Sequence, residues 1–284
     1  MMMTVIFPSS YFSDKAPDEE MAGEFAAARE TGLFETVLFS NEKWFERGEL
    51  SVGLSPATSV RAVYRGWMMK PPMYRDFYER LRERNICLIT SPEEYERFHI
   101  FPNIYPAFDG DTAEMMVFPE GCPVELERVR ERFSRFMVKD HVKSVKGTVF
   151  PRYFDSSVSR EEFERQMEIF YKFRGGLFTG GICIKEYLDL KKYGERTNEF
   201  RVFYAGGQVL SVSRNSGQPV FAPEPPMGLT GKYTGLGSPF YTVDYAETAD
   251  GEWKVIEAGD GQVSGLSDGQ DMGAFFRGLH CCIG

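Results

Sequence analysis

Short apolar runs alternate with amphipathic segments through the first hundred residues of the chain. The runs are rich in β-branched and aromatic residues, as strands are; they span 4–8, 34–40, 59–66 and 86–90. The last amphipathic segment begins with Ser91, Pro92 and Glu94, the residues of a helix capping box. Such alternation predicts an α/β domain with a largely parallel sheet covered by helices. No Gly-x-Gly-x-x-Gly motif follows these strands, so the sequence lacks a dinucleotide fingerprint there.

The organisation changes after these strands. Residues 101–123 are rich in Pro and Gly, and we expect a boundary in this stretch. Beyond it, the predicted strands are joined by hairpins, one at Gly206-Gly207 and one at Asp250-Gly251. We therefore predict a first domain of residues 1–120 and a second, α+β region of residues 121–284.

Composition argues against several classes of partner. The net charge of the 284 residues is −9 at pH 7, which disfavours a general nucleic-acid surface or a membrane surface. No apolar run approaches the ~20 residues of a membrane span, and the N-terminus lacks the basic region of a signal peptide. The five cysteines form no Cys-x-x-Cys pair. Reduced thiols and a cytoplasmic location are expected.

Carboxylates crowd the predicted hairpin YTVDYAETADGEWKVIEAGDGQVSG, residues 241–265. If Asp250 and Gly251 form a two-residue type I′ turn, Asp244 directly faces Glu257, with Cβ atoms about 5 Å apart. Like charges facing each other destabilise a sheet, and a hard cation bound by both carboxylates and by substrate phosphates would neutralise them. A solvated acidic face is the alternative that the hairpin alone leaves open.

Cations that suit such phosphates occur upstream, in FMVKDHVKSVKG, residues 136–147. Lys139 interrupts an apolar strand, and Lys143 and Lys146 follow on a loop whose backbone N–H groups could add to an anion cradle. The alternative is a solvated basic loop.

The Gly206-Gly207 turn predicts a second register, in which Glu199 faces Arg214. Arg201 would then lie on the same face, diagonal to Arg214. Two guanidinium groups beside an acidic metal pair would clamp a transferring phosphoryl group, whereas an ordinary cross-strand salt bridge is the alternative.

Two loops are further candidates for contact with substrate. The segment YRGWMMKPPMYR, residues 64–75, combines Arg65 and Lys70 with Trp67, although a strand end leading into a buried helix fits it as well. The Pro- and Gly-rich segment 222–240 is expected to be a mobile loop at the mouth of the site.

The order of these motifs resembles the ATP-grasp superfamily. The most similar group is a clade of bacterial and phage ATP-grasp proteins named for two arginines and one lysine. The motifs are FMVKDHVKS, KEYL, NEFRVFYAGGQVLSVSRNSG and the acidic hairpin, and they cover about residues 125–275. The resemblance implies an α/β, pre-ATP-grasp-like domain followed by an α+β ATP-grasp fold of two subdomains, of about 136–190 and 191–284.

The resemblance also implies roles for individual residues, with ATP bound between the two subdomains. Lys139, Lys143 and Lys185 would contact phosphate or the adenine edge, which Glu186, Tyr187 and Leu188 would line, and Glu199 would hold the ribose. Asp244 and Glu257 would bind Mg²⁺, with Mn²⁺ as the alternative ion, and Arg201, Arg214 and Lys146 would act at the reacting groups. Many relatives have Glu-x-Asn at the metal, but Gly259 takes the Asn position here. Asp260 is the expected third ligand, and the alternatives are Gln262 or a site with fewer protein ligands.

The implied activity is ATP-dependent ligation. A carboxylate of a small molecule or peptide would be activated as an acyl phosphate and joined to an amine, with release of ADP and phosphate. Three alternatives remain open: a phosphotransferase, a non-catalytic ATP-binding module, and an enzyme that modifies or joins nucleic-acid ends. The last would need a local basic track formed by Lys139, Lys143, Lys146 and Arg152.

Overall fold

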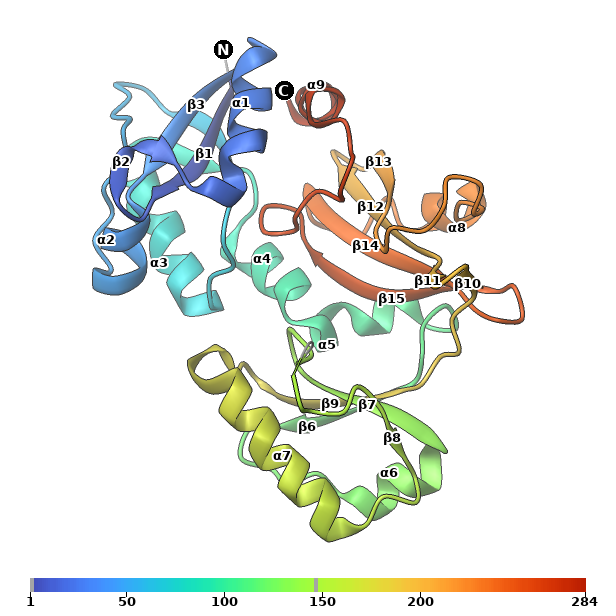
Figure 1. Cartoon of the computed structure of the whole chain (residues 1–284). Coiled ribbons are helices and arrows are strands. Elements are labelled where there is room, and N and C mark those ends of the chain that lie inside the picture. The colour runs from blue at the N-terminus through green and yellow to red at the C-terminus, as the bar shows by residue number, and fades with distance from the viewer. Residues whose placement is uncertain (1–2, 146–147) are drawn as a thin grey trace.

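The computed structural model describes residues 3–145 and 148–284, so the predicted phosphate ligand Lys146 lies outside the described residues. Within these residues the strands form three sheets of four or five strands and one two-stranded sheet. Figure 1 shows the three larger sheets in separate parts of the molecule, with α4 and α5 running between them. No helix in this part of the chain combines the length and apolarity that a membrane crossing requires.

The N-terminal sheet is parallel, as predicted, apart from one short strand. β1 (Met3–Ser10) pairs in parallel with β3 (Phe34–Phe39) and β4 (Val60–Tyr64), and β4 pairs with β5 (Ile86–Leu88). The unpredicted β2 (Ser13–Pro17) folds back antiparallel on the end of β1. The helices of this region are η1 (Glu19–Met21), α1 (Ala22–Glu30), α2 (Asn41–Arg47), α3 (Pro71–Arg82) and α4 (Pro92–His99). The capping box at Ser91 and Glu94 is confirmed.

The second sheet is antiparallel, in the order β6 (Met115–Pro119), β9 (Gly181–Glu186), β7 (Arg135–Asp140), β8 (Phe154–Asp155). α6 (Leu126–Arg132) and α7 (Arg160–Arg174), followed by η3 (Gly175–Leu177), pack on it through a core that includes Phe136 and Phe163. β6, α5 (Phe101–Ile104) and η2 (Tyr105–Phe108) lie in the stretch where only a boundary was expected. Because β6 pairs with β9, this sheet begins before residue 121.

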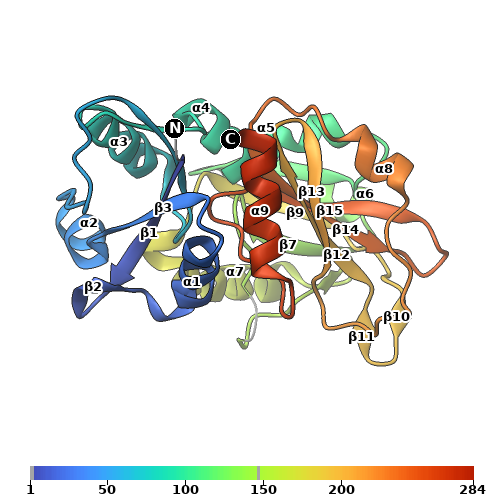
Figure 2. The same cartoon turned by 90° about the horizontal axis from the view of Figure 1, so that it is seen from above.

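The third sheet has the order β13 (Gln208–Arg214), β12 (Glu199–Ala205), β14 (Phe240–Glu247), β15 (Trp253–Asp260), and the small hairpin of β10 (Lys192–Tyr193) and β11 (Arg196–Thr197) precedes it. The unpredicted C-terminal helix α9 (Met272–Ile283) crosses between this sheet and the N-terminal sheet (Figure 2). Phe275 and Phe276 of α9 join Phe7 and Phe203 in one core. The segment 222–240 is not a plain loop, because it contains α8 (Met227–Lys232).

The acidic hairpin has the predicted central pair but not the predicted turn. Thr248 pairs with Glu252 around a three-residue loop, and Gly251 adopts φ +88°, as in a type I turn followed by a glycine bulge. Glu247 therefore faces Trp253, whereas the two-residue turn would place it opposite Lys254. A bulge at Ile256 then shifts the register back, so that Asp244 faces Glu257 as predicted.

The Gly206-Gly207 hairpin begins in the predicted register and then leaves it. A bulge at Leu210 shifts the pairing by one residue, so that Arg214 faces Phe200 and Arg201 faces Ser213. The predicted pairing of Glu199 with Arg214 is wrong. Since neighbouring residues of a strand point to opposite faces, Arg201 and Arg214 lie on opposite faces of the sheet.

Candidate functional site

Two carboxylates and two cations meet where the second and third sheets face each other. Arg201 lies directly across from Asp244 and donates to both of its carboxylate oxygens, at 2.9 Å and 2.8 Å. Lys139 reaches from β7 to the Glu257 Oε1 atom at 3.0 Å. Each carboxylate of the Asp244–Glu257 pair thus has its own cation, and these positive charges offset the repulsion between the two carboxylates.

The surrounding charges hold this cluster in its ionised form. Burial would raise the pKa of Glu257, but the ammonium groups of Lys139 and Lys143 outweigh burial and lower it well below its usual value. Burial would lower the pKa of Arg201, but the Asp244 carboxylate raises it above its usual value. A carboxylate that stays ionised over the whole physiological range is suited to bind a metal cation.

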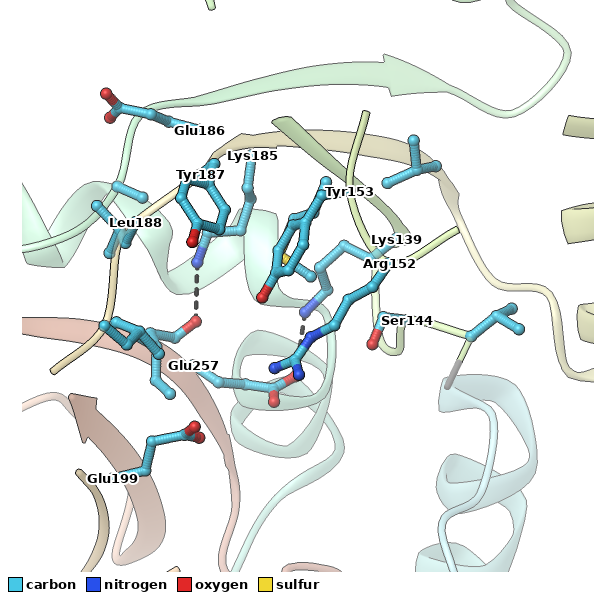
Figure 3. Close-up of a pocket in the computed structure, with 16 residues that line it drawn as sticks. Lys139, Ser144, Arg152, Tyr153, Lys185, Glu186, Tyr187, Leu188, Glu199 and Glu257 are labelled. Atoms are coloured by element: carbon cyan, nitrogen blue, oxygen red, sulfur yellow. Dashed lines mark hydrogen bonds and ion pairs between the residues drawn. The ribbon is translucent and has the colours of Figure 1, made fainter. Parts of the chain in front are cut away.

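Lys139 and Lys185 project from neighbouring strands of the second sheet toward β15 (Figure 3). Lys185 Nζ donates to the Ile256 carbonyl at 2.8 Å. Both ammonium groups lie over the ring of Phe101, at 5.0 Å and 4.6 Å from its centroid. Burial, reinforced by the charge of Lys139, lowers the pKa of Lys185 to about 7. Phe101 was missed in the sequence because it lies in the supposed boundary segment.

A cavity of about 110 Å³ opens beside these lysines. Residues that the sequence analysis singled out form much of its lining: Lys139, Lys185, Glu186, Tyr187, Leu188, Glu199 and Glu257. Tyr153, which no motif had indicated, packs edge-on against Tyr187 with ring centroids 4.7 Å apart. The Glu186 carboxylate points out of the cavity and accepts a hydrogen bond from the Glu114 N–H (Figure 3). The charge of Glu186 therefore lies outside the cavity, and its N–H group donates to the Glu114 carbonyl.

A second cavity, of about 70 Å³, lies on the other side of Glu257. Asp244, Arg201, Lys143 and His99 also line it. The loop that carries Lys143 is fixed by Asp140, whose Oδ1 accepts the N–H groups of Val142 and Lys143 at 2.7 Å and 2.6 Å. Glu257 borders both cavities, whereas Asp244 borders only the second.

Asp260 does not join the acidic pair. It faces Tyr241 on β14, so its side chain lies on the opposite face of the sheet from Asp244 and Glu257. Its Oδ1 accepts from the Gln262 N–H at 2.9 Å, and Gln262 in turn donates to Tyr74 at 2.8 Å. No cluster of three or more His, Cys, Asp or Glu side chains suited to a metal occurs in residues 3–145 and 148–284. The prediction of Asp260 as third ligand is wrong, and Gln262 is also turned to the N-terminal domain.

Asp260 should instead make stability depend on pH. Its Oδ2 atom is buried without a partner among the described residues, and burial raises the pKa of Asp260 to about 7. The unfolded chain releases this proton near pH 4. The stabilisation of the folded state by protonated Asp260 is therefore complete below about pH 4 and is lost as the pH rises to about 7. Between pH 5 and pH 8 we expect the free energy of unfolding to fall by about 3 kcal/mol more in the wild type than in Asp260→Asn. Urea titrations at both pH values measure this difference, and parallel profiles would contradict the assignment.

The loop 64–75 is not substrate-facing at Arg65. This side chain is 2% exposed and donates to both carboxylate oxygens of Glu24, at 2.8 Å and 2.7 Å. The other reading of this segment, a strand end that leads into a buried helix start, holds only in part: β4 ends at Tyr64, but Lys70 and Pro72 at the start of α3 are exposed.

Residues 127–279 match the model of a known domain family. That model describes an ATP-grasp domain, family 3 of the clade named for two arginines and one lysine. The match spans more than half of the chain and includes the cluster of Lys139, Arg201, Asp244 and Glu257. No curated protein matches the chain.

Solved structures resemble the chain over nearly its whole length. The ATP-grasp ligase PsnB, solved with a minimal precursor, shares 13% identity, and the match covers 99% of each chain with a TM-score of 0.62. D-cycloserine synthetase DcsG shares 15% identity, with 98% of each chain covered and a TM-score of 0.61. The macrocyclase MdnC from Microcystis aeruginosa, solved with precursor peptide MdnA, shares 11% identity over 97% of this chain and 98% of its own, with a TM-score of 0.61. At these identities the similarity establishes the fold.

Proposed function

Because this chain belongs to family 3 of the ATP-grasp clade named for two arginines and one lysine, we propose that it is an ATP- and Mg²⁺-dependent ligase. It activates a carboxylate as an acyl phosphate and joins the acyl group to an amine. Relatives in fold include ligases, and one was solved with Mg and ADP. The observation that carries the proposal is the meeting of Asp244 and Glu257 with Arg201 and Lys139 between two cavities.

The donor set fits Mg²⁺. Asp244 and Glu257 offer hard oxygen ligands from directly opposed positions of two strands. Mg²⁺ is usually bound by one or two carboxylates and completes its octahedron with water and substrate phosphates. Arg201 and Lys139, which now neutralise the pair, are then free to turn to phosphate oxygens. When bound, the ion would neutralise and orient the phosphates.

The first cavity suits the base of a nucleotide. Tyr187, Tyr153 and Leu188 supply apolar walls. The N–H groups of Glu186 and Tyr187 already donate to the Glu114 and Arg135 carbonyls, so the purine edge would meet the backbone of Leu188. Glu199 lies on the side of this cavity opposite Lys185 (Figure 3), where a ribose hydroxyl would meet its carboxylate. Lys139 and Lys185, which line the same cavity, would then face the phosphates beside Glu257.

The reacting groups would meet in the second cavity. A carboxylate oxygen of the substrate attacks the γ-phosphorus, and the bond to ADP breaks. The amine then attacks the acyl carbon, the bond to phosphate breaks, and the leaving phosphate takes up the proton that the amine loses. Arg201 and Lys143 hold the oxygens that carry charge in both steps, so positioning and charge neutralisation are the main contributions of the protein.

ADP release over a panel of carboxylic acids, amino acids and peptides tests the proposal. A ligase releases ADP and free phosphate only when both a carboxylate and an amine are present. Phosphoryl transfer that stops at a phosphorylated product yields ADP without free phosphate. That result would identify the protein as a phosphotransferase rather than a ligase. Nucleotide binding without ADP release under any pairing would contradict catalysis.

Nucleotide binding should take up a proton at Lys185. At pH 8 this side chain is largely neutral in the free protein, since its pKa is lowered to about 7. A phosphate anion beside it would raise the pKa again, so ADP binding at pH 8 should take up about one proton. Calorimetry in two buffers of different ionisation enthalpy measures the uptake. Lys185→Met should abolish it, whereas the exposed control Lys172→Met should not; equal uptake in all three proteins would contradict the role of Lys185.

A further inference from the structure

A third and larger cavity, of about 910 Å³, follows the outer edge of β13. One wall is the segment 268–271 before α9, where the Gln270 side chain donates to the Ser211 hydroxyl at 3.1 Å. The other wall is the loop 216–220, whose Val220 carbonyl accepts from Arg214 at 2.6 Å. Neither the predicted nucleotide contacts nor the acidic pair line this groove.

The floor of the groove is an unpaired strand edge. β13 is the terminal strand of its sheet within the described residues. The Asn215 N–H donates to the Glu199 carbonyl, and bonded pairs alternate along an antiparallel ladder. Ser213 and Ser211 therefore bond to β12, while Val212 and Arg214 turn their N–H and C=O groups toward the groove. Such an edge is a template for an added strand.

Charge and apolar surface make the two ends of the groove different. Arg196 and Arg214 lie at one end, and the Nε–H of Arg214 is buried without a partner among the described residues. Asp268 and Asp271 lie at the other end, beside the residues that contact Ser211. Val220 and Phe221 are 83% and 75% exposed at the arginine end. A ligand here would pair its backbone with β13, set a carboxylate against the arginines and cover the apolar rim.

We infer that this groove binds an extended segment of a peptide substrate, which adds as a strand to β13 and sets an acidic side chain against Arg214. The inference rests on the proposed ligase function and names its substrate class as polypeptide. The sequence predicted Arg214 at the transferring phosphate, and this inference gives it a role in peptide recognition instead. Its place on the face of the sheet opposite Arg201 supports the new role.

The spacing of the strands sets the distance between recognition and reaction. Strands lie about 4.8 Å apart, so a peptide added to β13 runs about 14 Å from β14, which carries Asp244. Four or five extended residues, at about 3.3 Å each, span that distance. The reacting group should therefore lie about that many residues from the acidic residue that Arg214 recognises.

Selection from a displayed library of random dodecapeptides on the full-length protein tests the inference without ATP or Mg²⁺. We expect enriched peptides to share β-branched residues at alternate positions and one Asp or Glu in a common register. Val212→Pro should weaken their binding at least tenfold, because it removes an N–H that points to the groove and spares the ladder to β12. Arg214→Gln should do the same, whereas Arg165→Gln, on the exposed face of α7, should have no effect.

The controls separate this inference from the proposed function. ADP binding and thermal melting of Val212→Pro show whether the protein is folded, and ADP turnover reports on ligation independently of the selection. The inference is overturned if the enriched peptides bind wild type and folded Val212→Pro equally. It is equally overturned if no peptide is enriched, or if N-acetylglutamate binds as tightly as the peptides.

Discussion

Glu257→Gln is expected to reduce ADP release by about 100-fold or more while the protein still folds and binds nucleotide. The substitution keeps the shape of the side chain but removes the charge that faces Asp244 and pairs with Lys139. Loss of one preorganised electrostatic contact in an active site costs about 10²–10³ in turnover. Asp244→Asn should have an effect of similar size, because Mg²⁺ would lose the other carboxylate.

The same hairpin provides the matched control. Glu252 is exposed beside the turn, so Glu252→Gln removes one negative charge without touching the cluster and should leave ADP release unchanged. Mg²⁺ titration sharpens the comparison, since the two site variants should need more Mg²⁺ for half-maximal turnover and the control should not. If Asp244→Asn and Glu257→Gln both release ADP at the wild-type rate, the metal site is assigned to the wrong residues.

The acidic pair was predictable because two deviations in the hairpin compensate. The loop is one residue longer than a two-residue turn, which shifts the register by one, and the bulge at Ile256 shifts it back before Glu257. The Asp-Gly sequence and the alternation of the strands indicate a hairpin, but nothing in them indicates a bulge. The correct pairing of Asp244 with Glu257 therefore came from a turn that is not formed.

In the Gly206-Gly207 hairpin one bulge shifts the register, and no second bulge restores it in the described pairs of β12 and β13. The extra residue at Leu210 moves Arg214 to the face opposite Arg201, because a slip of one residue turns every following side chain over. Glycine at the turn fixes where the strands begin to pair, and Ala205 does face Gln208 as expected. Beyond Leu210 the register is offset by one residue from the one that the turn sets, and the local sequence gives no sign of that bulge.

The position of Asp260 could not be predicted from the sequence for a different reason. The resemblance to relatives with Glu-x-Asn at the metal made Asp260 the expected third ligand, yet its side chain lies under the N-terminal domain, where Gln262 and Tyr74 meet. That contact joins residues far apart in sequence, so no local pattern predicts it. Lys139 and Lys185, by contrast, could be predicted from a local pattern. A lysine within a buried apolar strand needs a partner and therefore marks a site.

Substitution of Arg65 is expected to have the largest effect on the free energy of unfolding. Its guanidinium donates to both carboxylate oxygens of Glu24 and to the carbonyls of Gly261 and Ser264, in the segment that follows the Glu257 strand. The Glu24 side chain is 7% exposed. Removal of one partner of a buried ion pair leaves an uncompensated charge and costs about 3–5 kcal/mol. Arg65→Met should therefore lower the free energy of unfolding by about that amount.

A double-mutant cycle distinguishes the ion pair from lost packing. Glu24→Gln combined with Arg65→Met removes both charges, so the double variant should be more stable than Arg65→Met alone by about 1 kcal/mol or more. Arg61→Met, at an exposed position of β4 shortly before Arg65, should leave the urea midpoint unchanged. Because Arg65 holds the segment 261–264 against the N-terminal domain, ADP release by Arg65→Met should also become more sensitive to temperature. A cost below about 1 kcal/mol for Arg65→Met would mean that Glu24 is readily rehydrated and that the two domains are joined mainly by the aromatic core around Phe275.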